Sequence, residues 1–137
     1  MQVQRRGEKA EQWSLYGGAG TIGVDWYFQP ATRLPTSVLL YHLEPGAEEG
    51  EHLHQRGHPD SCSVISEDEL YLCVSGTVTA TVADESVVLH PGDAVYVPEG
   101  VPHGIRNDSE VGADVVLLFG PPDGNVFAQA SPEEPAP

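Results

Sequence analysis

The sequence is poor in cysteine, in positive charge and in long apolar runs. Its 137 residues include only two cysteines, Cys62 and Cys73, far below the density of a disulfide scaffold, so we predict two reduced thiols. Residues 1–12 are charged and lack an apolar run of signal-peptide length. No window holds the roughly eighteen consecutive apolar residues that a membrane helix needs. The sequence therefore predicts a cytoplasmic protein without a membrane partner.

Positive charge is scarce throughout. Against 21 Asp and Glu stand 6 Lys and Arg, which gives a formal net charge of −15. Nonspecific affinity for nucleic acid rests on cationic side chains that displace counterions from phosphates. We therefore expect no nucleic-acid partner.

Turn residues are abundant and divide the chain into short segments. The sequence has 15 Gly and 12 Pro, and 39% of its residues are apolar, enough for one core. Runs rich in β-branched and aromatic residues lie between the turns, at 23–28, 37–43, 70–74, 77–82, 86–89, 94–97, 103–106 and 114–119. Short strands at this spacing indicate an antiparallel sandwich or barrel. Only Gln2 to Leu15 could hold a helix.

The chain is long enough for one domain. We predict an N-terminal arm over residues 1–20, a β-domain over 21–127 and a disordered tail over 128–137. The tail is predicted because its Pro- and Glu-rich residues cannot bury enough apolar surface to offset the entropy of ordering them.

Four residues of metal-ligating type form the candidate site. His52 and His54 are two apart, and side chains at that spacing on a strand share one face. Neutral imidazole is the commonest protein ligand for divalent transition metals. Glu69 opens a later predicted strand and His103 another. Three histidines and one carboxylate on neighbouring strands could complete a site for a single ion.

Two stretches of fixed spacing around these residues resemble the cupin family. Gly46, five residues and His52-x-His54, followed later by Glu69, six residues and Gly76, are similar to the first cupin motif. The second motif is complete and reads Gly92, five residues, Pro98-x-Gly100, two residues, His103, three residues and Asn107. The resemblance implies an all-β, antiparallel jelly-roll β-barrel of cupin type, with a metal held by His52, His54, Glu69 and His103.

One spacing departs from the family pattern. Fourteen residues, Gln55 to Asp68, separate His54 from Glu69, where cupins usually have only a few. Glu69 is therefore assigned from its spacing to Gly76, and Glu67 and Asp68 stay open as alternatives. The inserted segment is either a lid over the site or a tolerated surface insertion, since doubling a loop costs only about 0.6 kcal/mol.

Three imidazoles and one carboxylate leave one or two positions open on a five- or six-coordinate metal, which is typical of a catalytic centre. Fe is the first candidate metal, and Zn, Mn or Ni also suit these donors. We expect a small-molecule metalloenzyme, first an Fe(II)-dependent dioxygenase. The alternatives are a redox-neutral isomerase, lyase or polyketide cyclase, a non-catalytic ligand-binding cupin, and a metal-free structural barrel.

Two further side chains are candidates for catalytic roles. Arg56 follows the histidine pair and could anchor a substrate carboxylate with its bidentate guanidinium. Tyr71 shares the face of Glu69, where a phenol could orient or protonate substrate; core packing is the competing interpretation. His42, His58 and His90 are expected to be surface or satisfied polar residues. The resemblance also suggests a homodimer, with the strand at 23–28, which carries Trp26 and Phe28, as the candidate interface.

Overall fold

Every regular element of the described residues, 1–123, is a β-strand in a computed structural model of the protein. The strands are β1 (Glu11–Trp13), β2 (Ile22–Trp26), β3 (Ser37–Leu43), β4 (Glu48–His52), β5 (Asp68–Ser75), β6 (Val78–Val82), β7 (Glu85–Leu89), β8 (Ala94–Val97), β9 (His103–Arg106) and β10 (Ala113–Gly120). This part of the chain contains no helix with the length and apolar character needed to cross a membrane. The predicted tail at 128–137 lies outside the described residues.

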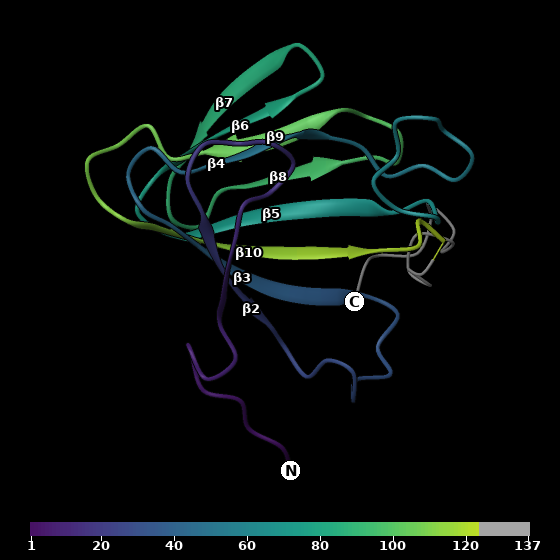
Figure 1. Ribbon diagram of the computed structural model, residues 1–137, viewed down its shortest axis with the longest axis horizontal. Helices are drawn as coiled ribbons and strands as arrows, with labels where there is room; N and C mark the ends of the chain where they lie inside the picture. Colours follow the sequence, from purple (N-terminus) through teal and green to yellow (C-terminus); the bar gives the residue numbers. More distant parts are fainter. Residues whose placement is uncertain (124–137) are drawn as a thin grey trace, which may run out of the picture.

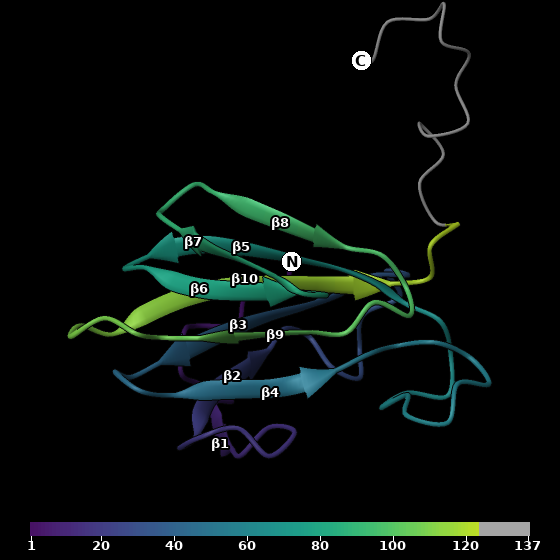
Figure 2. The same ribbon diagram turned by 90° about the horizontal axis from the view of Figure 1, so that it is seen from above.

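Two antiparallel sheets form the fold. The larger has the order β1-β2-β3-β10-β5-β8 and the smaller the order β4-β9-β6-β7. Figures 1 and 2 show the two groups of strands layered against each other, with the N-terminal segment crossing them before β2. The antiparallel all-β fold expected from the strand spacing is confirmed as a two-sheet sandwich.

The core lies between the sheets because alternate residues of each strand point inward. In β3 the side chains of Leu39, Tyr41 and Leu43 are buried while their neighbours are partly exposed. Tyr71 and Cys73 of β5 are fully buried by the same alternation. The strands therefore follow the period of two that a sheet packed on one face requires.

The N-terminal arm corrects one expectation, because residues 2–15 form turns and the short strand β1 instead of a helix. Its polar groups bond to the sheet beneath. Gly7 N–H donates to Asp25 Oδ2 at 2.8 Å, and Arg6 Nη2 donates to Asp114 Oδ1 at 2.7 Å. A helix would give up these contacts to the sheet, so tertiary hydrogen bonds override the local preference.

Residues 15–20 pack directly against β4. The N–H of Gly50 donates to the carbonyl of Leu15 at 3.0 Å, and that of Glu48 donates to Ala19 at 2.9 Å. A Cβ at Gly50 would lie only 2.0 Å from the carbonyl oxygen of Tyr16. Glycine at this position therefore lets the arm approach β4 closely and brings Tyr16 over the end of that strand.

Candidate metal centre

The structure brings the four predicted ligands together between the sheets. His52 ends β4, His54 lies just beyond it, Glu69 is on β5 and His103 begins β9. One potential ligand atom from each residue lies within 4.8 Å of the others, and all four side chains are buried. Distant segments of the chain thus converge on one point.

Backbone carbonyls fix the orientation of two of the histidines. His52 Nδ1 lies 2.8 Å from the carbonyl oxygen of Gly50, and His103 Nδ1 lies 2.8 Å from that of Val101. A carbonyl oxygen only accepts, so each Nδ1 carries the proton and donates it. Nε2 of each ring then points into the cluster, where a metal would bind it in place of any proton that it carries, which is the arrangement that metal-binding histidines commonly show.

Glu69 is the central acceptor of the cluster. Its Oε2 lies 2.6 Å from His103 Nε2 and 3.2 Å from His54 Nε2. Burial acts to raise the pKa of Glu69, but the hydrogen bonds from His103 and His54 outweigh it and hold that pKa at about 2. Glu69 is therefore a carboxylate at neutral pH, the form that binds a metal.

The remaining two histidines differ in their electrostatic surroundings. Burial and the nearby His103 lower the pKa of His52 to about 4, so its ring is neutral. Burial also acts to lower the pKa of His54, but the Glu67 and Glu69 carboxylates raise it to about 9. Three imidazoles and a carboxylate with this geometry fit a divalent transition metal, and binding would displace the proton on His54.

The two acidic alternatives to Glu69 have other positions. Glu67 is buried behind His54, with Oε1 at 3.5 Å from His54 Nδ1. Asp68 instead accepts hydrogen bonds from Tyr96 Oη and from the N–H of Glu99. Of the three neighbouring acids, Glu69 alone belongs to the cluster.

A second buried carboxylate, which sequence reasoning missed, lies beneath the cluster. Glu49 accepts a hydrogen bond from Tyr41 Oη at 2.7 Å and another from Tyr71 Oη, and its Oε1 is 3.9 Å from His52 Nε2. Burial and the charge of Glu69 raise the pKa of Glu49 to about 7, against these two hydrogen bonds. Both tyrosines have pKa values raised by burial, so they stay protonated as donors.

A cavity of about 200 Å³ opens above the cluster. Apolar and aromatic side chains supply most of its wall, together with His52, His54, Glu69 and Glu67; the apolar and aromatic members are Trp13, Leu15, Tyr16, Trp26, Leu39, Tyr41 and Phe119. Tyr16 stacks on the ring of His52, with 3.9 Å between centroids and 16° between planes. The cluster is thus accessible to a small molecule through a mainly aromatic chamber.

The inserted segment contributes to this chamber. Its residues Cys62, Ser63 and Glu67 line the cavity, and Cys62 Sγ lies 3.3 Å from His54 Nδ1. Figure 2 shows the loop that follows β4 extending beyond the ends of the strands. Both Cys62 and Cys73 are free thiols. The segment therefore forms part of the wall beside His54, and its opening or closing as a lid stays a prediction.

The structure does not place the two candidate catalytic residues in the cavity wall. Arg56 is exposed, and only its backbone N–H is engaged, donating to Ser66 Oγ at 3.0 Å. Tyr71 is fully buried, with 5.9 Å between its ring centroid and that of His103, and its hydroxyl donates to Glu49. The predicted roles of Arg56 as a substrate anchor and of Tyr71 as a direct proton donor therefore stay predictions without a contact in support.

The predicted dimer interface on the strand at 23–28 stays a prediction. Trp26 lines the cavity and packs edge-on against Phe119, with 5.7 Å between ring centroids. In the sheet, β1 pairs with Ile22, Gly23 and Val24 of β2, and β3 pairs with β2 on the other side. The homodimer likewise stays a prediction.

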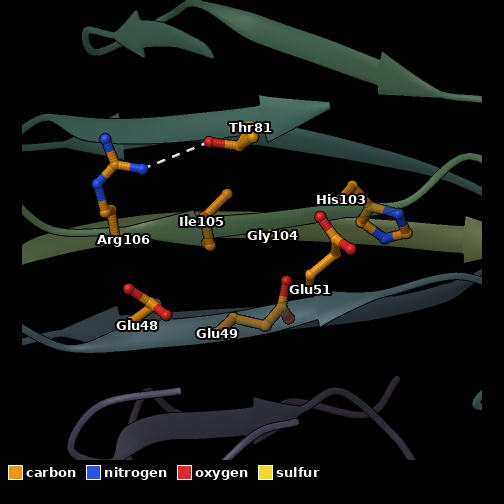
Figure 3. A pocket seen from close by; sticks show the side chains of 8 residues that line it. All are labelled: Glu48, Glu49, Glu51, Thr81, His103, Gly104, Ile105 and Arg106. Atoms are coloured by element: carbon orange, nitrogen blue, oxygen red, sulfur yellow. Dashed lines mark hydrogen bonds between the residues drawn. The ribbon is translucent and has the colours of Figure 1, made fainter. Parts of the chain in front are cut away.

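A separate hollow lies over β4, β9 and β6, and Figure 3 shows its lining. Glu48, Glu51 and Arg106 line it, and the Arg106 side chain is directed toward Thr81, with Nη1 3.4 Å from Thr81 Oγ1. Among the four cluster residues it includes His103 alone. The aromatic cavity, which contacts three of the four, is therefore the side from which a substrate would reach the centre.

An antiparallel β-sandwich with three histidines and one glutamate buried at the base of a cavity defines a small all-β protein with a candidate single-metal centre. The model of the cupin domain (Cupin_2) matches residues 39–119, which is more than half of the chain and contains all four cluster residues. The chain belongs to the cupin family.

Individual relatives agree with this assignment. An uncharacterized protein of Streptomyces coelicolor, SCO3923, is 33% identical over 97 residues, which is 71% of this chain and 81% of that protein. The crystal structure of a predicted oxalate decarboxylase of Thermotoga maritima has a TM-score of 0.73 at 21% identity, and the match covers 88% of this chain and 98% of that chain. The plu4264 protein of Photorhabdus luminescens has a TM-score of 0.67 at 12% identity, and the match covers 93% of this chain and 94% of that chain. These solved structures share the fold.

Proposed function

We propose that this cupin is a metal-dependent enzyme that acts on a small molecule bound in the aromatic cavity. The observation that carries the proposal is the convergence of three buried imidazoles and Glu69 at the base of that cavity. On a five- or six-coordinate ion these four protein ligands leave one or two positions open to a substrate, which a closed structural site does not. Fe(II) is the first candidate metal, and the reaction that we infer with it is oxidation by dioxygen.

Different residues around this centre would orient the metal ligands and shield the site from water. A bound divalent ion would supply Lewis acidity, and Fe(II) would add electron transfer to dioxygen. The carbonyls of Gly50 and Val101 hold the imidazoles of His52 and His103 in their inward orientation. Tyr16 covers His52 and, with the other aromatic side chains, limits the access of water to the base of the cavity.

A redox-neutral reaction is the second candidate, and the Glu49 network favours it. Tyr41 lines the cavity and donates its hydroxyl proton to Glu49 Oε2 at 2.7 Å. The pKa of Glu49, raised to about 7 by burial and the Glu69 charge, lets this carboxyl gain or lose a proton near neutral pH. A proton could thus pass between Glu49 and a substrate through Tyr41, as an isomerase, lyase or cyclase requires.

Two parallel assays separate these candidates. Protein loaded anaerobically with Fe(II) is given a panel of small phenols, enolisable ketones and carboxylates, and dioxygen uptake is recorded. Zinc-loaded protein receives the same panel under nitrogen, with product formation followed by mass spectrometry. We expect uptake that His103→Ala abolishes and that the matched variant His58→Ala retains. Turnover with zinc alone would contradict the oxidative reaction and support the redox-neutral one. No turnover in either assay would contradict both and indicate a ligand-binding protein.

A further inference from the structure

The cavity above the metal cluster is lined by no lysine or arginine. The chain has six Lys and Arg residues, all of them within the described part, and none lines the cavity. Two of the six are engaged elsewhere, Arg6 with Asp114 and Arg106 with Asp108. Enzymes that bind phosphate or carboxylate groups usually place an arginine or lysine against them. This wall offers no such partner to an anion.

The acidic residues of the site strengthen this argument. Glu67 and Glu69 both line the cavity and are buried. Their two carboxylates balance the two positive charges that a divalent ion would bring, so the metal-loaded site gains no net positive charge. An anion entering this chamber would lose its hydration without a net positive charge to compensate, which is unfavourable.

The shape and chemistry of the wall favour a flat ring. Aromatic side chains approach from several elements: Trp13 from β1, Trp26 from β2 and Phe119 from β10, with Tyr16 stacked on His52. The rings of Phe119 and His54 are nearly parallel, at 15°, with 6.2 Å between centroids. Aromatic faces bind other rings by stacking or edge contacts. An apolar cavity of about 150 Å³ is enough to hold benzene, and this one measures about 200 Å³.

We propose that the substrate is a small, uncharged aromatic compound that presents an oxygen atom to the metal cluster. This inference rests on the proposed function, because it takes the aromatic cavity as the substrate site. It excludes sugar phosphates and dicarboxylates as substrates. It assigns Trp13 and Tyr16, which are 37% and 45% exposed, to the rim of the cavity.

Tryptophan fluorescence reports directly on this cavity, because the chain has two tryptophans and both line it. Benzamide and benzoate have nearly the same shape and differ in charge at pH 7.5, so they form a matched pair of probes. Both are titrated into zinc-loaded protein, and cyclohexanecarboxamide serves as the non-aromatic control. We expect benzamide to bind at least tenfold more tightly than benzoate and more tightly than cyclohexanecarboxamide. A smaller preference over benzoate, equal binding of the cyclohexane compound, or no binding of benzamide would overturn the proposal.

A charge variant at the rim tests the same inference in the opposite direction. Trp13→Arg places a cation at the cavity mouth and leaves Trp26 as the fluorescent reporter. It should tighten benzoate binding at least fivefold and weaken benzamide binding. The matched variant Val88→Arg adds the same charge on the exposed side of β7 and should change neither. An equal gain of benzoate affinity in both variants would assign the effect to overall charge and would contradict the role of the rim.

Zinc content, measured on each titrated sample, separates failure of this inference from failure of the proposed function. If the protein holds one zinc per chain but binds benzoate more tightly than benzamide, the proposed substrate class is wrong and the metal-dependent function is unaffected. If the protein retains no zinc but still prefers benzamide as expected, the metal-dependent function is wrong and the specificity for uncharged aromatic ligands is supported.

Discussion

Replacing the buried Glu49 by glutamine should change how the stability of the protein depends on pH. The pKa of this carboxyl is raised from 4.5 to about 7, chiefly because burial disfavours its charged form. The folded state therefore binds a proton over a range in which the unfolded state has released it. For such a raised pKa, the associated stabilisation is present below about pH 4.5 and is lost as pH rises toward 7.

The shift sets the size of the effect. One pKa unit corresponds to about 1.4 kcal/mol, so titration of Glu49 should lower the free energy of unfolding of the wild type by about 2 to 3 kcal/mol between pH 5 and pH 8. Glu49→Gln keeps a neutral side chain of the same shape at every pH. The free energy of unfolding of wild type minus that of Glu49→Gln should therefore fall by this amount from pH 5 to pH 8.

Urea denaturation of metal-free protein, with a chelator present, measures this difference. Glu51→Gln is the matched control, because Glu51 is an exposed glutamate on the same strand, solvated in both the folded and the unfolded state. Its difference from wild type should stay constant within about 0.5 kcal/mol. A constant difference for Glu49→Gln as well would refute the description of Glu49 as a buried, pH-sensitive carboxyl.

Three further substitutions test other parts of the structure by urea denaturation. Gly76→Ala should lower the free energy of unfolding by at least about 2 kcal/mol, because the φ of Gly76 is +69° and a Cβ would lie 2.6 Å from the carbonyl oxygen of Gly112. The control Gly57→Ala has φ +78° but open space around the Cβ and should lower it by only about 1 kcal/mol, so equal losses would contradict the steric argument. Tyr71→Phe should cost about 2 to 3 kcal/mol at pH 8, since it removes a buried donor to a carboxylate, and a loss below about 0.5 kcal/mol would show that this bond is unimportant. The pKa of His42 is raised by hydrogen bonds to two carboxylates, so His42 should stabilise the fold most below about pH 6.5 and lose that contribution as pH rises through the raised value. His42→Gln should therefore lower the free energy of unfolding more at pH 6 than at pH 9, and the reverse order would contradict the ion pairs.

Most strands could be predicted from the sequence because turn residues and β-branched runs mark them clearly. All eight predicted strands correspond to observed ones, such as 37–43 with β3. The two strands that were missed, β1 and β4, lack that composition. The run Glu48-Glu49-Gly50-Glu51 of β4 is charged and reads as solvent-exposed surface. It pairs with β9 because of tertiary contacts that local sequence does not reveal.

The same strand explains why Glu49 was missed while the four cluster residues were found. The histidines and Glu69 occur in recognisable motifs, whereas Glu49 lies in a run of like charge. Counting back by twos from His52 would place Glu49 on the outer face, but the β4–β9 register shifts between Glu49 and His52. Such an irregularity moves both side chains to the inner face. Burial of Glu49 beside two tyrosines then depends on β3 and β5, which no local pattern predicts.

Metal content of reconstituted protein tests the central claim most directly. Wild type and single variants are incubated with Fe(II), Mn(II) or Zn(II), freed of loose metal by gel filtration, and analysed for metal per chain. We predict one tightly held ion in wild type and in the control His90→Ala, and affinity weakened at least about 100-fold in His103→Ala and Glu69→Gln. Metal retained equally by all four proteins, or by none, would contradict a metal centre built from His52, His54, Glu69 and His103.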